Sequence, residues 1–75
     1  MNPRIVIDPR VCSGKPVIRG TRIMAHQVPS MMAAGYSIAE VLQDFPQLEA
    51  EDVIACLEWA AELIAAQTAA AVAVG

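Results

Sequence analysis

Two predicted helices separated by only two residues are the feature that most constrains this chain. Residues 37–40 read Ser-Ile-Ala-Glu, a capping box in which the serine hydroxyl and the glutamate carboxylate each satisfy a free amide at a helix start. Gly35 suits the end of the preceding helix, because glycine adopts left-handed backbone without strain. With only Gly35 and Tyr36 between them, the two helices must cross sharply.

Apolar residues recur at helical spacing in three segments, about 26–34, 37–45 and 50–67. Pro29 fits the first segment only in its opening turn, where a missing N–H costs little, and Pro46 ends the second. The predicted core face of the third helix consists of Val53, Ile54, Leu57, Ala60, Ala61 and Ile64. The face predicted to lie opposite carries Glu51, Ala55, Glu58 and Glu62.

Residues 4–23 contain short extended segments. Residues 4–8 are rich in β-branched side chains and are ended by Pro9, and residues 15–18 form a second piece in which Pro16 suits an edge strand. Such short strands need a helical layer or a second copy to cover one face. The sequence therefore predicts one mostly α domain, with a short N-terminal β element and a three-helix, helix-turn-helix-like bundle. A 75-residue chain buries a modest core, so we also expect a dimer.

The charges are divided between the two ends of the chain. Five basic residues and one acid in residues 1–22 give a net charge of +4, and seven acids in residues 23–75 give −7, for a total of −3. The basic residues are Arg4, Arg10, Lys15, Arg19 and Arg22. This division suggests that one end binds anions and the other binds a basic or neutral surface.

Catalytic and metal-binding patterns are weak. His26 is the only histidine, and Cys12 and Cys56 are the only cysteines. A scattered histidine and cysteine do not make a zinc motif, and no nucleophile motif adjoins His26. We therefore expect no enzymatic activity, no metal, no cofactor and no small-molecule substrate. Cys12 is expected to be buried under a turn, and Cys56 to lie in the core or at an interface.

The C-terminal third is the most apolar part of the chain, but Glu58, Glu62 and Gln67 interrupt it. A membrane span needs about 20 nearly uninterrupted apolar residues, so we expect none. A charged start followed by an apolar run is not visible, and two cysteines do not suggest a secreted disulfide framework. The expected location is the cytoplasm.

Residues 15–22, Lys-Pro-Val-Ile-Arg-Gly-Thr-Arg, are the most suggestive stretch for binding. Basic side chains on a turn-rich surface suit phosphate contacts, which position a protein on DNA without reading bases. The predicted DNA-binding residues are Lys15, Arg19, Thr21 and Arg22. The alternative is that Gly20 and Thr21 only shape a turn, while the arginines are solvated or pair with the acidic helices.

The third helix is unsuited to the usual recognition-helix position in the major groove, because its outer face is acidic and carboxylates repel phosphates. The acidic face suits a basic protein instead, such as an RNA-handling nuclease. Trp59 lies on the flank of this helix, and tryptophan is enriched at interfaces, so we expect a dimer mate or another partner to cover it. The predicted partner-binding residues are Glu51, Glu58, Trp59 and Glu62. A merely solvated helix face is the alternative.

Several motifs together resemble the domain of unknown function 433 family. They include Asp-Pro at 8–9, Gly-Lys-Pro at 14–16 and Ile-Arg-Gly-Thr-Arg at 18–22, followed by the later Pro46, Leu48, Glu51 and Asp52. The resemblance covers about residues 5–61. Family members usually have glycine at the position of Ser13, threonine or serine at that of Glu49, and a helix former at that of Pro29.

The resemblance implies an antitoxin-like protein with a winged or helix-turn-helix-like fold. Such proteins are commonly paired with a PIN-like ribonuclease toxin, which they neutralise, and they can repress their own operon by binding operator DNA. The leading hypothesis is therefore an antitoxin of a type II toxin–antitoxin pair. The alternative is a homodimeric protein-interaction module with no DNA-binding role, which the net negative charge favours.

Overall fold

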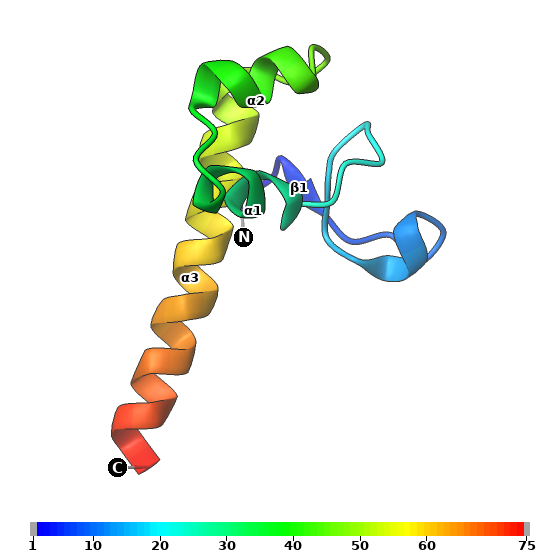
Figure 1. The fold of residues 1–75 in the computed structure, drawn as a ribbon. Coiled ribbons are helices and arrows are strands. Elements are labelled where there is room, and N and C mark those ends of the chain that lie inside the picture. The colour runs from blue at the N-terminus through cyan, green and yellow to red at the C-terminus, as the bar shows by residue number, and fades with distance from the viewer. Residues whose placement is uncertain (1, 75) are drawn as a thin grey trace.

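In the computed structural model, the backbone is described for residues 2–74 and the side chains for residues 2–67. The elements are β1 (Ile5–Val6), a single turn η1 (Cys12–Gly14), β2 (Val17–Ile18), α1 (Gln27–Ala33), α2 (Ile38–Asp44) and α3 (Ala50–Val74). Helix α3 is the long axis of the molecule, with α1 and α2 beside its first half and the hairpin loops on one side (Figure 1). The predicted mostly helical fold with a short N-terminal β element is confirmed.

Strands β1 and β2 form a two-stranded antiparallel sheet, with Ile5 opposite Ile18 and Val6 opposite Val17. One backbone hydrogen bond extends the pairing beyond β1, since the Arg19 amide donates to the Arg4 carbonyl at 2.8 Å. An isolated bridge between Val17 and Met24 extends it on the other side. Strands of two residues cannot persist alone, so this sheet depends on its packing against α3.

The connection from α1 to α2 is built by local interactions. Gly35 has φ +103°, and a Schellman motif forms there, in which the Tyr36 amide donates to the Met31 carbonyl at 3.1 Å. The predicted capping box then starts α2. The Glu40 amide donates to the Ser37 hydroxyl at 3.1 Å, and the Ser37 amide donates to the Glu40 carboxylate at 3.0 Å. These bonds lower the pKa of Glu40, chiefly because its carboxylate accepts from the Ser37 amide.

The core gathers residues from both strands and from all three α-helices around the first half of α3. Its members are Ile5, Ile18, Ile23, Ala25, Val28, Val41, Leu48, Val53, Ala55 and Cys56. No aromatic residue is among these buried members, so the core has a small volume, as expected for a chain of this length.

The predicted core face of α3 is partly wrong. Ile54 is 46% exposed, Ile64 is 63% exposed and Ala61 is also exposed, whereas Ala55, predicted to face solvent, is fully buried. Two apolar stripes share the helical period along α3, and the pattern alone does not choose between them. The small side chains of Ala55 and Cys56 face the body of the protein, which allows the rest of the chain to approach the helix closely.

Helix α3 also ends later than predicted, at Val74 instead of about residue 67. The segment after Ile64 is rich in alanine, the residue with the highest helix propensity, and contains no glycine or proline before Gly75. Among the described residues, no helix is both long enough and apolar enough to cross a membrane.

A partly buried ion pair connects the N-terminal segment to the start of α3. Arg4 Nη1 donates to Asp52 Oδ1 at 2.9 Å, and a longer contact of 3.5 Å reaches Glu49. Asp52 is only 9% exposed, and its second oxygen accepts from the Glu49 amide at 2.8 Å. The carboxylate therefore also caps the first turn of α3, where an acid is favoured by the helix dipole.

The turn η1 contains an unusual run of left-handed residues. Cys12 and Ser13 have φ values of +49° and +57°, and Gly14 follows at +81°. Cys12 is half-buried, in contrast to the buried position predicted, and its thiol donates to the Arg22 carbonyl at 3.5 Å. Cys56, predicted to lie in the core or at an interface, is fully buried in the core. Burial, with a smaller contribution from Asp52, raises the pKa of the Cys56 thiol to about 11.

Removal of the Asp52 carboxylate is expected to destabilise the fold. Asp52→Ala leaves the Glu49 amide uncapped and the Arg4 guanidinium without its closest partner, for a loss of about 2 kcal/mol in the free energy of unfolding. Glu49→Ala removes only the longer, solvent-exposed contact and should change that free energy by less than about 0.5 kcal/mol. Urea denaturation at one fixed protein concentration measures both. Equal losses in the two variants would contradict this account of the ion pair.

Replacement of Ser13 by glycine is expected to stabilise the protein. A non-glycine residue in left-handed backbone costs about 1–2 kcal/mol, and the extra freedom that glycine has in the unfolded chain offsets part of the gain. Ser13→Gly should therefore raise the free energy of unfolding by about 0.5 kcal/mol. Ser13→Ala removes the same hydroxyl but keeps the strained backbone, and should bring no gain. Thermal unfolding followed by circular dichroism compares them, and a gain in the alanine variant would argue against strain.

Candidate functional site

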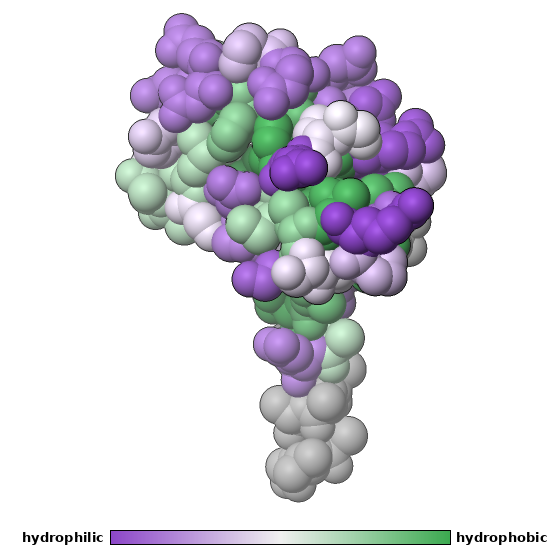
Figure 2. Space-filling view, turned by 90° about the vertical axis from the view of Figure 1, so that its right-hand side faces the viewer, coloured by the Kyte–Doolittle hydropathy of each residue, from purple (hydrophilic) through white to green (hydrophobic). Residues whose placement is uncertain are grey.

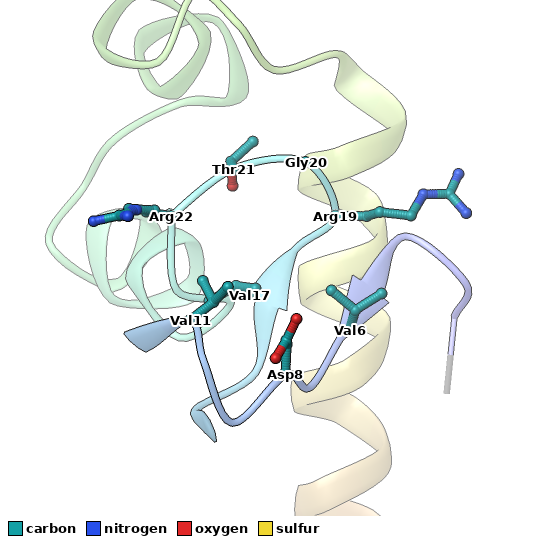
Figure 3. A pocket seen from close by; sticks show the side chains of 8 residues that line it. All are labelled: Val6, Asp8, Val11, Val17, Arg19, Gly20, Thr21 and Arg22. Carbon is teal, nitrogen blue, oxygen red and sulfur yellow. The ribbon is translucent and has the colours of Figure 1, made fainter. Parts of the chain in front are cut away.

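The loop formed by residues 19–22, here called the cationic loop, borders an open concavity of about 540 Å³ (Figure 3). The residues around this concavity are Val6, Asp8, Val11, Val17, Arg19, Gly20, Thr21 and Arg22. Its floor is thus mainly apolar, and its rim holds most of the predicted DNA-binding residues. On the side of the molecule that carries the hairpin loops, the surface shows apolar patches next to strongly hydrophilic side chains (Figure 2).

The two arginines of the cationic loop flank the concavity and do not fill it. In Figure 3, the Arg19 and Arg22 side chains point outward on opposite sides of the loop, and both residues are exposed. Lys15, the remaining predicted cation, is also exposed but is not among the residues around the concavity. Outward-pointing guanidinium groups on a loop are well placed to contact an extended anionic surface.

Thr21 has a structural role in this loop. Its hydroxyl donates to the Ile18 carbonyl at 2.8 Å and accepts from the Ile23 amide at 3.0 Å. These bonds hold the backbone of the turn and leave the hydroxyl little capacity for a ligand. Gly20 has φ +79°, and a Cβ atom added there would meet nothing within 4 Å. The tip of the loop is therefore open to a partner, and glycine is required by its backbone conformation.

Asp8 is the acidic group at the concavity, and Arg10 neutralises it. Its carboxylate accepts from Arg10 Nε and Nη2, both at 3.1 Å, and from the Arg10 amide at 2.9 Å. The side-chain bonds to Arg10 are the main reason why the pKa of Asp8 is lowered. An anion that approaches the cationic loop thus meets a neutralised pair and not a lone carboxylate.

The ion pairs divide the basic residues into two groups. Arg4 is paired with the start of α3, and Arg10 is paired with Asp8. Within residues 2–67, Lys15, Arg19 and Arg22 have no ion-pair partner. The cations that remain for a ligand are therefore the three predicted ones.

The acidic side chains predicted to bind a partner lie on one exposed face of α3. Glu51, Glu58 and Glu62 are all exposed and are spaced seven and four residues apart, which places them on one side of a helix. We call this set the acidic ridge. The Glu58 carboxylate accepts from Asn2 Nδ2 at 3.3 Å, so one member of the ridge has a weak contact within the chain.

Trp59 lies elsewhere on α3 than the acidic ridge. It is half-buried and packs against the core, so the chain itself covers part of the side chain that we expected a partner to cover. Trp59 also borders a groove of about 330 Å³ between α1 and α3. The residues of this α1/α3 groove are His26, Pro29, Ser30, Trp59, Ala60, Leu63, Ile64 and Gln67.

The α1/α3 groove was missed by the sequence analysis. His26 and Pro29 are more than 30 positions from the α3 residues that they face, and no local pattern connects them. The helical period of Trp59, Leu63 and Gln67 was a signal that these three residues share a face. In the described part of the chain, no three His, Cys, Asp or Glu side chains gather as metal ligands.

Comparison with known proteins gives a consistent result. The family described as "Protein of unknown function (DUF433)" matches residues 5–60. A crystal structure of a DUF433 member protein from Anabaena variabilis is similar with a TM-score of 0.76 and 33% identity, over 81% of this chain and 60% of that one. The uncharacterized protein y4eO of Sinorhizobium fredii is 37% identical over 49 residues, which is 65% of this chain and 22% of y4eO. The chain spans less than two thirds of either relative.

Proposed function

The chain belongs to the DUF433 family, and from its surfaces we propose that it is a non-enzymatic, antitoxin-like binding module of a type II toxin–antitoxin pair. In this proposal, the acidic ridge binds and neutralises a basic protein, a PIN-like ribonuclease toxin. The cationic loop, together with Lys15, contacts operator DNA and allows the protein to repress its own operon.

The observation that carries the proposal is the separation of two charged surfaces on different elements. Lys15, Arg19 and Arg22 lie in loops of the N-terminal segment and have no ion-pair partner within residues 2–67. The acidic ridge lies along α3. If the two surfaces existed only to hold the fold together, their charges would be expected to pair with one another, as those of Arg4 and Asp52 do. Their separation supports two different partners of opposite charge.

The N-terminus of α3 is unsuited to contact DNA phosphates. In many helix-turn-helix proteins the first residues of the recognition helix meet the bases and the backbone. Here Glu49, Glu51 and Asp52 occupy that end, and Arg4 already pairs with two of them. Phosphate contacts from the cationic loop and Lys15 are the favourable alternative. Three such contacts per protomer should give a slope of log affinity against log salt of about −3.

The alternative function is a homodimeric protein-interaction module with no DNA-binding role. The net charge of −3 favours it, because long-range electrostatics then oppose approach to DNA. A titration with duplex DNA at low salt distinguishes the two functions.

The DNA-binding part of the proposal predicts a defined loss on removal of the loop cations. Arg19→Ala combined with Arg22→Ala should weaken binding to every duplex sequence and lower the slope of log affinity against log salt by about 2 per protomer. Fluorescence anisotropy with labelled duplex DNA over a range of salt concentrations measures both quantities.

The matched control is Asp8→Asn combined with Arg10→Gln, which removes a neighbouring arginine without changing the net charge and should leave binding unaltered. If the wild type does not bind DNA at low salt, or if the two double variants lose the same affinity, the cationic loop is not a DNA contact.

The toxin-binding part of the proposal predicts that binding of a partner protein depends on the acidic ridge. Tagged protein purified from its native cells should recover a small PIN-like protein in nearly equal amount, as identified by mass spectrometry. Glu62→Lys should lower this recovery by at least about tenfold, because a like charge then faces a basic partner. Asp44→Lys makes the same charge change at an exposed position of α2 and should recover the wild-type amount. Recovery of the tagged protein alone would favour the alternative function.

A further inference from the structure

Helix α3 continues its core-facing stripe past the end of the core. Val53 and Cys56 are fully buried, Ala60 is half-buried, and Leu63, on the same side of the helix, is 46% exposed. The reason is visible in Figure 1, where α3 runs on after α1 and the other elements have ended. The helix thus presents an apolar face for which its own chain supplies no further cover among the described residues.

The α1/α3 groove lies where this face emerges. Its floor is the stretch of α3 from Trp59 to Gln67, and its wall is the first turn of α1, with His26 and Pro29. Leu63 and Ile64, 46% and 63% exposed, are the large apolar side chains within it. Hydrophobic side chains are visible at the junction where the projecting helix leaves the body (Figure 2).

We propose that the α1/α3 groove is the contact surface for a second copy of the chain, whose α3 packs antiparallel against it in a two-fold symmetric dimer. In such a dimer each groove receives the projecting helix of the other copy, so the same residues act on both sides. This proposal does not depend on binding of DNA or of a toxin. It also assigns a residue-level surface to the dimer that the short chain length led us to expect.

The distribution of charge favours contact between two copies through the groove over contact through the other faces of α3. The residues of the groove include no carboxylate, and His26 is their only ionisable side chain. Two copies that meet through this face therefore bring no like charges together, although each chain carries −3. Contact through the acidic ridge would instead oppose three carboxylates with three others.

The length of α3 beyond the body suits a small contact and a weak dimer. Residues 61–74 continue α3 beyond Ala60, and at 1.5 Å per residue they add about 21 Å of helix. The large apolar side chains described within the groove are Leu63 and Ile64, so the contact belongs with small interfaces. The expected dissociation constant is on the order of micromolar.

Analytical ultracentrifugation of the wild type, at concentrations from about 1 to 500 µM, should show a monomer–dimer equilibrium in the micromolar range. Leu63→Glu places two carboxylates in the apolar contact and should raise the dissociation constant at least about tenfold. Ile54→Glu is the matched control, because Ile54 is also 46% exposed on α3 but lies on a different side of the helix. It should leave the equilibrium unchanged.

The fluorescence of Trp59, the only tryptophan, supplies an independent measurement. Its emission should shift to longer wavelength as the wild type is diluted through the dissociation constant, because the indole loses its cover in the monomer. In the Leu63→Glu variant the same shift should occur at concentrations at least about tenfold higher. Far-UV circular dichroism checks that both variants fold, and Leu63→Gln replaces Leu63→Glu if that variant does not.

Three results would overturn the proposal. The wild type could sediment as a monomer at every concentration, which would leave the groove to a different protein. Ile54→Glu could dissociate the dimer as strongly as Leu63→Glu does, which would place the contact on another face. Lastly, the dimer could dissociate without any change in the emission of Trp59, which would remove the groove from the interface.

Discussion

The ion pair between Arg4 and Asp52, together with the burial of Val53 and Cys56, fixes the rotation of α3 about its own axis. A largely buried carboxylate requires hydrogen-bonding partners, and the Arg4 guanidinium and the Glu49 amide supply them. With Asp52 turned inward, Ala55 and Cys56 also face the body, and Ile54 is turned outward. The positions of the acidic ridge and of the α1/α3 groove both follow from this rotation.

Two ion pairs, Arg4–Asp52 and Arg10–Asp8, determine which basic residues remain unpaired within residues 2–67. Arg4 is used for folding and Arg10 is used to neutralise Asp8, so the chain retains three unpaired cations within residues 2–67, all in the loops directly before and after β2. The end of α3 that would otherwise attract phosphate is covered by its own carboxylates and by Arg4. In the proposed function, DNA therefore meets loops and not a helix, which differs from the usual use of a helix-turn-helix-like fold.

Local signals in the sequence predicted most of the fold. The capping box of Ser37 and Glu40 and the left-handed Gly35 involve residues within four or five positions, so the sequence contains all the information that they need. The Arg4–Asp52 pair joins residues 48 positions apart, and neither residue carries a local sign of its partner. For this reason the choice between the two apolar stripes of α3 could not be made from the sequence.

The candidate site also has features that the sequence predicts and features that depend on packing. The exposure of Arg19 and Arg22 follows from a basic, glycine-containing loop, and the sequence was sufficient to single them out. The internal hydrogen bonds of Thr21 depend on how residues 18–23 turn, and the groove depends on where α1 lies against α3. Both are properties of the packed chain.

The burial of Cys56 has a practical consequence for spectroscopy. A thiol with a pKa of about 11 inside the core is almost entirely protonated at neutral pH and reacts slowly with maleimides, whereas Cys12 is half-exposed beside the cationic loop. The native sequence therefore has one addressable thiol and one indole, Trp59, at two different surfaces. A dye on Cys12 and the intrinsic emission of Trp59 form a donor–acceptor pair that reports the distance between the two surfaces without any engineered residue.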